Sequence, residues 1–158
     1  MNMMRTLVAI CCASAAIFSP THEVIAAEPK SLAEVEEFAF GGVGAAGTES
    51  QGERFFRTVM EETDAVVTFK KILGHGTPAA KLYALCGIRL LSEKDFAAAA
   101  EPLLKSNETV TTIGGCTLLK QRVADVAHQI SLGSYDVQLK NPTRWPDQKP
   151  NEMPPRQR

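Results

Sequence analysis

Apolar and polar positions are most sharply patterned between Thr77 and Leu91, where almost every side chain is apolar or small. Only Lys81 and Arg89 interrupt this run with clearly polar side chains, and on a helical wheel they lie within about 80° of each other. A helix that is apolar almost all round lies in a core or a membrane, and this run is too short to cross a bilayer. Thr77 suits the N-cap and Pro78 the first helical position. We therefore predict a buried central helix from Thr77 to Leu91.

Two amphipathic segments precede this helix. Ser31 and Glu34 have the spacing of a capping box, which predicts a short helix. The inward positions of that helix are Leu32, Val35 and Phe38 or Ala39. The longest helix is predicted between Thr48 and Leu73, with Thr48 or Ser50 as its N-cap, and Gly74 suits the left-handed position that ends it. Its apolar stripe comprises Phe55, Val59, Val66, Phe69 and Leu73, flanked by Phe56, Met60 and Val67.

Two further helices and a hairpin are predicted after the central helix. Ser92 and Asp95 favour a helix start, and Pro102 should kink that helix or stop it near Glu101. The β-branched run from Thr109 to Ile113 favours a strand, which Gly114-Gly115 can turn into a hairpin returning through Cys116 to Leu118. From about Leu119 a last helix is expected, ending at Gly133. Its inward face comprises Leu119, Val123, Val126, Ala127 and Ile130.

These patterns predict a mainly α fold, a compact helical domain of four to five helices with room for one short β-hairpin. We assign residues 27–135 to this domain and residues 136–158 to a proline-rich, largely disordered tail. The tail holds five of the nine prolines and too few apolar side chains to fold alone. Trp145 is the exception, and it either docks onto the domain or serves as an exposed anchor for a partner.

The first 26 residues have the layout of a secretory signal peptide. A short positive start up to Arg5 is followed by an apolar run from Thr6 to Phe18 and by small residues at Ala26 and Ala27. Cleavage after Ala26 or Ala27 would deliver the protein to the periplasm or the extracellular space, with no transmembrane segment remaining. The charge of −1 is unchanged by removing Arg5 and Glu23, so no strong field attracts nucleic acid or anionic lipid.

Two cysteines, Cys86 and Cys116, remain after signal removal. An even pair in an exported chain favours a disulfide between them. The alternative is two buried thiols, because free cysteine packs as a small hydrophobic residue. No C-x-x-C spacing points to a redox site.

The glycine-rich run from Gly41 to Gly47 is the only motif that suggests a ligand. Gly42, Gly44 and Gly47 fit G-x-G-x-x-G, but a dinucleotide site needs a βαβ unit and a P-loop needs a lysine where Thr48 stands. A loop whose N–H groups hold an anion remains open. The candidate ligand residues are therefore Gly42, Gly44, Gly47, Thr48 and His75.

No catalytic, metal or cofactor site is predicted. His75 and His128, the histidines outside the signal peptide, lack the spacing of a metal-binding pair, and no nucleophile motif such as G-x-S-x-G occurs. We expect no cofactor.

The segments FAFGGVGAAGTESQGE and GTPAAKLYALCGIRL, with GGC downstream, resemble small exported bacterial proteins that carry no established activity. The successive amphipathic helices are also similar to HEAT-type repeats in architecture. The expected function is a non-catalytic binding or structural protein of the cell envelope or extracellular space, with a protein or a small molecule as partner. The alternative is a small enzyme with a site between residues 41–47 and His75, which would require one deep pocket joining the two.

Overall fold

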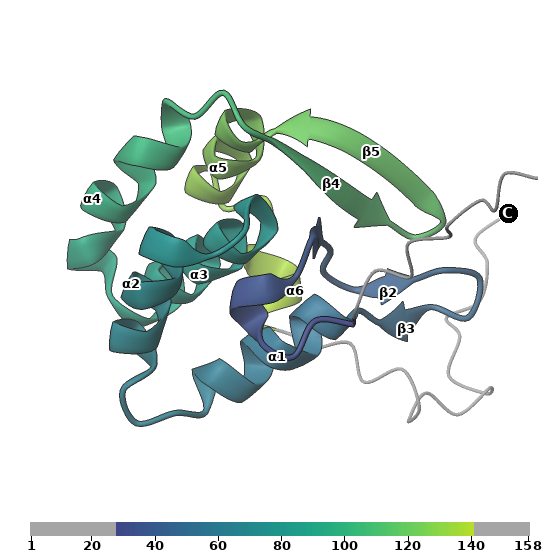
Figure 1. Cartoon of the computed structure of the whole chain (residues 1–158), viewed down its shortest axis with the longest axis horizontal. Helices are drawn as coiled ribbons and strands as arrows, with labels where there is room; N and C mark the ends of the chain where they lie inside the picture. Colours follow the sequence, from purple (N-terminus) through teal and green to yellow (C-terminus); the bar gives the residue numbers. More distant parts are fainter. Residues whose placement is uncertain (1–27, 141–158) are drawn as a thin grey trace, which may run out of the picture.

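A computed structural model describes residues 28–140 of the chain. The expected signal peptide, the last 18 residues of the expected tail and Trp145 lie outside these described residues. Figure 1 shows helices gathered around one central helix, with a long β-hairpin projecting to one side.

The fold is mixed α/β, so the predicted mainly α class of four to five helices is wrong. Helices make up 57% and strands 17% of the described residues, with six α-helices and five strands in two small sheets. Three of the strands have only two residues each, and strand pairings that short leave no periodic pattern in a sequence.

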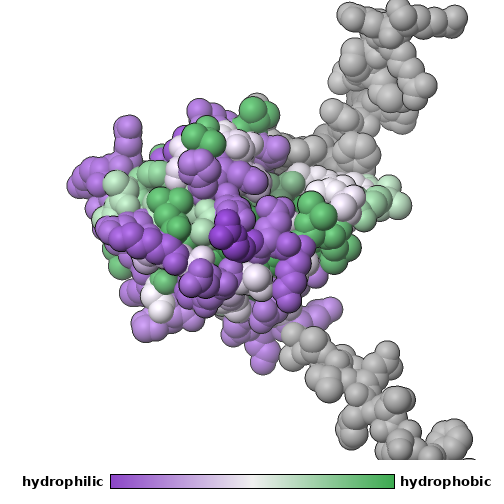
Figure 2. Space-filling view, turned by 90° about the horizontal axis from the view of Figure 1, so that it is seen from above, coloured by the Kyte–Doolittle hydropathy of each residue, from purple (hydrophilic) through white to green (hydrophobic). Residues whose placement is uncertain are grey.

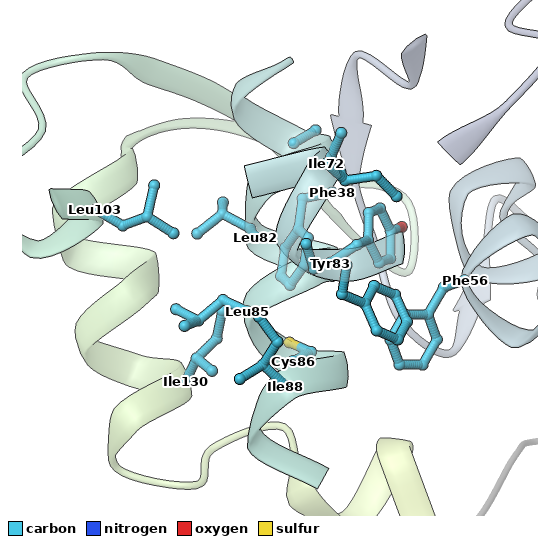
Figure 3. Close-up of a cluster of buried hydrophobic side chains, with 14 of the residues drawn as sticks. Phe38, Phe56, Ile72, Leu82, Tyr83, Leu85, Cys86, Ile88, Leu103 and Ile130 are labelled. Atoms are coloured by element: carbon cyan, nitrogen blue, oxygen red, sulfur yellow. The ribbon is translucent and has the colours of Figure 1, made fainter. Parts of the chain in front are cut away.

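The predicted central helix is confirmed as α3, Pro78–Leu91. The Thr77 hydroxyl accepts a hydrogen bond from the Ala80 N–H at 3.1 Å, as an N-cap should. Every residue of α3 from Leu82 to Ile88 is buried, and the helix contacts α1 (Gln51–Met60), α2 (Ala65–His75), α4 (Glu93–Leu104) and α5 (Val123–Ser131). Figure 3 shows its side chains meeting those of the surrounding elements. Complete burial of each large apolar side chain contributes about 1.5–3 kcal/mol, so this helix organises the core.

The single long helix predicted from Thr48 to Leu73 is two helices, α1 and α2. The polar residues 61–64 form the turn between them, in which the Glu62 N–H donates to the Val59 carbonyl at 3.1 Å. Ser50 is the N-cap of α1, as predicted, and accepts a hydrogen bond from the Glu53 N–H at 3.0 Å. Val59 and Phe69 of the predicted stripe are buried, whereas Phe55, Val66 and Leu73 are only half-buried, because the turn changes the direction of the chain. The buried apolar residues of the two helices are Phe56, Val59, Ala65, Phe69 and Ile72.

The main sheet has the strand order β1-β4-β5. Strand β4 (Thr109–Gly114) and strand β5 (Thr117–Arg122) form the predicted antiparallel hairpin, and β1 (Glu37–Phe38) runs parallel to β4. Before β1 the chain forms only a 3-10 turn, Leu32–Glu34, and the expected Ser31 side-chain cap is absent there. The hairpin is longer than predicted because β5 continues to Arg122, so the last helix begins at Val123 and not at Leu119.

A second, smaller sheet pairs β2 (Gly42–Val43) with β3 (Thr48–Glu49) in antiparallel register. The glycine-rich run is therefore a tight β-turn structure, in which Gly44 and Gly47 have φ of 70° and 61°. The Gly44 N–H donates to the Gly115 carbonyl at 2.9 Å, so this loop is attached to the tip of the main hairpin.

Two predicted boundaries also change. Helix α4 continues through Pro102 to Leu104. Helix α6, Asp136–Lys140, lies in the segment predicted to be a disordered tail, and its Leu139 side chain is buried in the core. Arg89 of α3 holds α6 in place through its ion pair with Asp136 at 3.0 Å. No helix between residues 28 and 140 combines the length and the apolar character needed to cross a membrane.

Candidate functional site

The glycine loop and His75, which the sequence analysis combined into one candidate site, lie on different parts of the molecule. Gly42, Gly44, Gly47 and Thr48 belong to the β2–β3 structure, whereas His75 is the exposed last residue of α2. No hydrogen bond joins His75 to the glycine loop among residues 28–140. Surface cavities of about 640, 700 and 430 Å³ are lined by other residues and contain none of the five. The structure therefore does not bring the predicted ligand residues together.

The N–H groups of the glycine loop are largely engaged within the protein. Besides the bond from Gly44 to Gly115, the Gly47 N–H donates to the Gly44 carbonyl at 3.1 Å. The Gly41 N–H donates to Glu53 Oε2 at 2.9 Å. An anion at this loop would compete with these bonds and would meet the Glu53 carboxylate, so the loop is poorly suited to hold phosphate.

Glu53 is a buried carboxylate that sequence reasoning did not single out. One of its oxygens accepts the Gly41 N–H, and the other pairs with Arg57, which also binds Glu49 Oε1 at 3.0 Å. The spacing of Glu53 and Arg57 by four residues in a helix was a signal that could have indicated this pair. Since all of its partners come from the protein, Glu53 joins the glycine loop to α1 and is not free to act as an acid or base.

Tyr83 is the second buried polar group, and it also has a structural role. Its hydroxyl donates to the Ala39 carbonyl at 2.7 Å and accepts from the Ala39 N–H at 2.9 Å. Ser50 Oγ lies 3.3 Å from the same oxygen and donates to the Ala39 carbonyl at 2.9 Å. Burial raises the pKa of Tyr83 well above its usual value, so the phenol stays protonated. These bonds fix the segment after β1 between α1 and α3, as Figure 3 shows for the position of the ring.

The core around these groups is filled. A Cβ atom added at Gly52 would lie 2.6 Å from the Tyr83 ring, and one added at Gly87 would lie 2.3 Å from the Phe69 ring. The Tyr83 ring packs against Phe38 and Phe56 in tilted contacts, with centroids 4.8 and 6.0 Å apart. Close packing of rings on glycine leaves no room for a ligand between α1, α2 and α3.

The predicted disulfide between Cys86 and Cys116 is absent, because the structure has both as free thiols. Cys86, a residue of α3, is buried in the protein core, near Leu85 and Ile88 in Figure 3. Cys116 is exposed at the tip of the hairpin. Burial raises the pKa of Cys86 well above its usual range, so this thiol is unreactive in the folded state. A disulfide needs Cα atoms within about 7 Å, and the hairpin carries Cys116 away from the core helix.

An acidic groove of about 700 Å³ lies between the first described residues and the N-terminus of α1. Four carboxylates and one lysine line it, together with apolar atoms. The Gln51 side chain donates across it to the Pro29 carbonyl at 3.1 Å. One wall of the groove begins at Glu28, the first described residue.

The hairpin edge, which we define as strand β5, is the most exposed regular element of the protein. Leu118 is 62% and Leu119 is 53% exposed, although both are large apolar residues. Their partners across the ladder are Ile113 and Thr112, so the two leucines lie on opposite faces of the hairpin. Figure 2, which views the molecule from above, has hydrophobic surface at its right-hand end, where Figure 1 places both the hairpin tip and the β2–β3 turn. The hairpin edge therefore exposes apolar side chains and pairs with no strand other than β4 among residues 28–140.

The charge on the hairpin is positive. Residues 109–122 include Lys120 and Arg122 and no acidic residue. Arg122 pairs with Asp125 at 2.6 Å, and this hydrogen bond lowers the pKa of Asp125. Lys120 forms no ion pair with any residue in the range that the structure describes. An uncompensated cation therefore lies beside the exposed leucines.

Sequence reasoning predicted the hairpin but missed its exposed edge, because Leu119 was assigned to the inner face of a helix. The strand-forming run Thr109–Ile113 and the two glycines after it were a signal that could have extended the return strand to Arg122.

Comparisons with known proteins do not add a relative. No family model, no curated protein and no solved structure matches this chain.

Proposed function

We propose that the protein is a non-catalytic, exported binding protein that contacts a protein partner in the cell envelope or extracellular space through the hairpin edge. The observation that carries this proposal is the exposure of Leu118 and Leu119 on the two faces of β5, the edge strand of the main sheet. Large apolar side chains grouped on a sheet edge attract another chain, which is why sheet proteins normally protect such edges.

The arrangement of polar groups also favours binding over catalysis. Glu53 and Tyr83 are engaged by the glycine loop, Arg57 and Ala39, and His75 is exposed at the end of α2. The alternative enzyme would need a pocket that joins His75 to residues 41–47, and the cavities described above are lined by other residues. Export is supported by the layout of residues 1–26.

Site-specific photocrosslinking in the producing cell tests this proposal. A photoreactive amino acid placed at Leu118 should give a discrete adduct of higher mass than the protein. The matched control is the same amino acid at Leu132, which is 70% exposed but lies after α5 and away from the hairpin. Equal adducts from both positions, or none from Leu118, would contradict the proposal.

A further inference from the structure

We infer that the partner adds a β-strand to the hairpin edge, and that this strand is an extended, acidic segment of another polypeptide with apolar residues facing Leu118 and Leu119. This inference rests on the proposed function and specifies the chemistry of its partner. Three features of β5 carry it, namely its free backbone edge, the position of its leucines on both faces, and its charge.

The backbone edge of β5 is available for pairing. Among residues 28–140, β5 pairs with β4 and with no other strand, and it forms one end of the β1-β4-β5 sheet. In an antiparallel pair every second residue directs its N–H and C=O groups away from its partner. A row of such groups along six residues can form a ladder with one more strand.

The positions of the leucines favour an added strand over a ligand that covers one face. Leu119 shares its face with Thr112, which is buried, whereas Leu118 shares the other face with Ile113. A helix or small molecule on either face would cover one leucine and leave the other exposed. Successive side chains of an added strand point to opposite faces, so one strand places a neighbour beside each leucine.

The charge favours an acidic partner over a second copy of this chain. Leu118, Lys120 and Arg122 share one face of β5, and Arg122 is already paired with Asp125. Pairing of two β5 strands would bring two more cations to an edge that has no carboxylate. A partner with a carboxylate opposite Lys120 supplies the missing charge, and edge lysines are a known means of preventing self-association.

Nuclear magnetic resonance titration with a designed peptide tests this inference. In antiparallel register, Glu-Thr-Glu-Val-Ile-Thr places a carboxylate opposite Lys120 and apolar residues opposite Leu119 and Leu118. We expect the amide signals of β5 to shift on titration, and the peptide to compete with the Leu118 photocrosslink. The charge-reversed control, Lys-Thr-Lys-Val-Ile-Thr, should bind at least tenfold more weakly, and the variant Lys120→Glu should reverse this preference.

Two N-methylated versions of the peptide separate strand addition from contact through side chains alone. Methylation of the amides that face β5 should abolish binding, whereas methylation of the alternate amides should be tolerated. Equal binding of the two versions would overturn the inference. Concentration-dependent dimerisation of the purified protein through β5, detected by light scattering, would also overturn it in favour of a second copy.

The outcomes distinguish this inference from the proposed function. A photocrosslinked adduct at Leu118 combined with no shift of the β5 amides by the acidic peptide would overturn strand addition and leave the binding function standing. Absence of both the adduct and the peptide effect would overturn both.

Discussion

Glycine positions show how closely individual residues are fitted in the core. Gly87 lies in the middle of α3, where the Phe69 ring occupies the space that a side chain would need. Gly74, near the end of α2, has no atom within 4 Å of its ideal Cβ position. Packing therefore requires glycine at position 87 but not at position 74. Alanine at each position separates the effect of packing on stability from the effect of helix propensity.

Gly87→Ala should lower the free energy of unfolding by about 1–3 kcal/mol, the usual cost of overpacking a core. Gly74→Ala, the matched control, should leave it unchanged or raise it by up to about 1 kcal/mol, because alanine favours helix more than glycine. Urea denaturation followed by circular dichroism measures both. A Gly87→Ala protein as stable as the Gly74→Ala protein would show that Phe69 has room to move.

The buried phenol of Tyr83 should make the protein less stable at alkaline pH. Burial raises the pKa of its phenol above the usual tyrosine value of about 10, so the folded chain keeps a proton that the unfolded chain releases. The contribution of Tyr83 to stability is therefore complete below about pH 10 and decreases as the pH rises further. Between about pH 10 and 11 the urea midpoint should fall more steeply in the wild type than in Tyr83→Phe.

The buried thiol of Cys86 needs its own control in this experiment. Burial also raises its pKa, and an unfolded thiol titrates near pH 8.5, so its loss of stability begins earlier. Cys86→Ala should remove the part of the slope that starts at about pH 8.5. Identical slopes for the wild type and Tyr83→Phe above about pH 10 would show that Tyr83 does not titrate on unfolding.

Helix starts illustrate how element boundaries are determined by single side chains. Ser50 caps α1 through the Glu53 N–H and also donates to the Ala39 carbonyl, so it joins the helix to the segment after β1. Ser92 precedes α4, but its side chain accepts no hydrogen bond from the backbone N–H groups of that helix, and its hydroxyl donates to the Asp95 side chain instead. The two serines have the same position relative to their helices and different functions.

Ser50→Ala should therefore cost about 1–2 kcal/mol of unfolding free energy, at the upper end of measured N-cap effects. Ser92→Ala should cost about 0.5–1 kcal/mol, since only one partly buried hydrogen bond between side chains is lost. Thermal unfolding of the two variants, compared at equal pH and salt, provides the measurement. Equal destabilisation would contradict the assignment of Ser50 as the capping residue.

Elements with strong local signals were predictable, and those made by distant pairing were not. The apolar run of α3 and the β-branched run of β4 were identified from sequence because propensity and periodicity agree within each segment. Strand β1 was missed because two residues become a strand only by pairing with β4, far along the chain. Leu119 was assigned to a helix because its spacing to Val123 fits both a helix and the junction of a strand with a helix.

The candidate site was less predictable than the fold, because the residues proposed from motifs were separated in space. A G-x-G-x-x-G match describes spacing along the chain, whereas the role of Gly44 depends on Gly115 in the hairpin. Whether β5 lies at the edge of the sheet depends on the absence of a further partner strand, and the local sequence carries no information on that.

At the scale of the whole molecule, one thiol lies in the core and the other lies on the surface. In the protein beginning at Ala27, alkylation under native conditions should modify Cys116 alone, because Cys86 is fully buried. In denaturant both should react, which intact mass will show as two additions. The rate of Cys86 labelling then reports global opening, since α3 is released only when the core opens. Two unreactive cysteines without reductant would indicate the disulfide that the structure lacks.

The hydrogen bond from Gly44 to Gly115 couples the motion of the hairpin tip to that of the glycine loop. A strand seated on β5 would hold the tip still and would therefore slow amide exchange in the loop, which the strand does not touch. The loop is also joined to α1 through Glu53, so occupation of the edge would be transmitted towards the central helix.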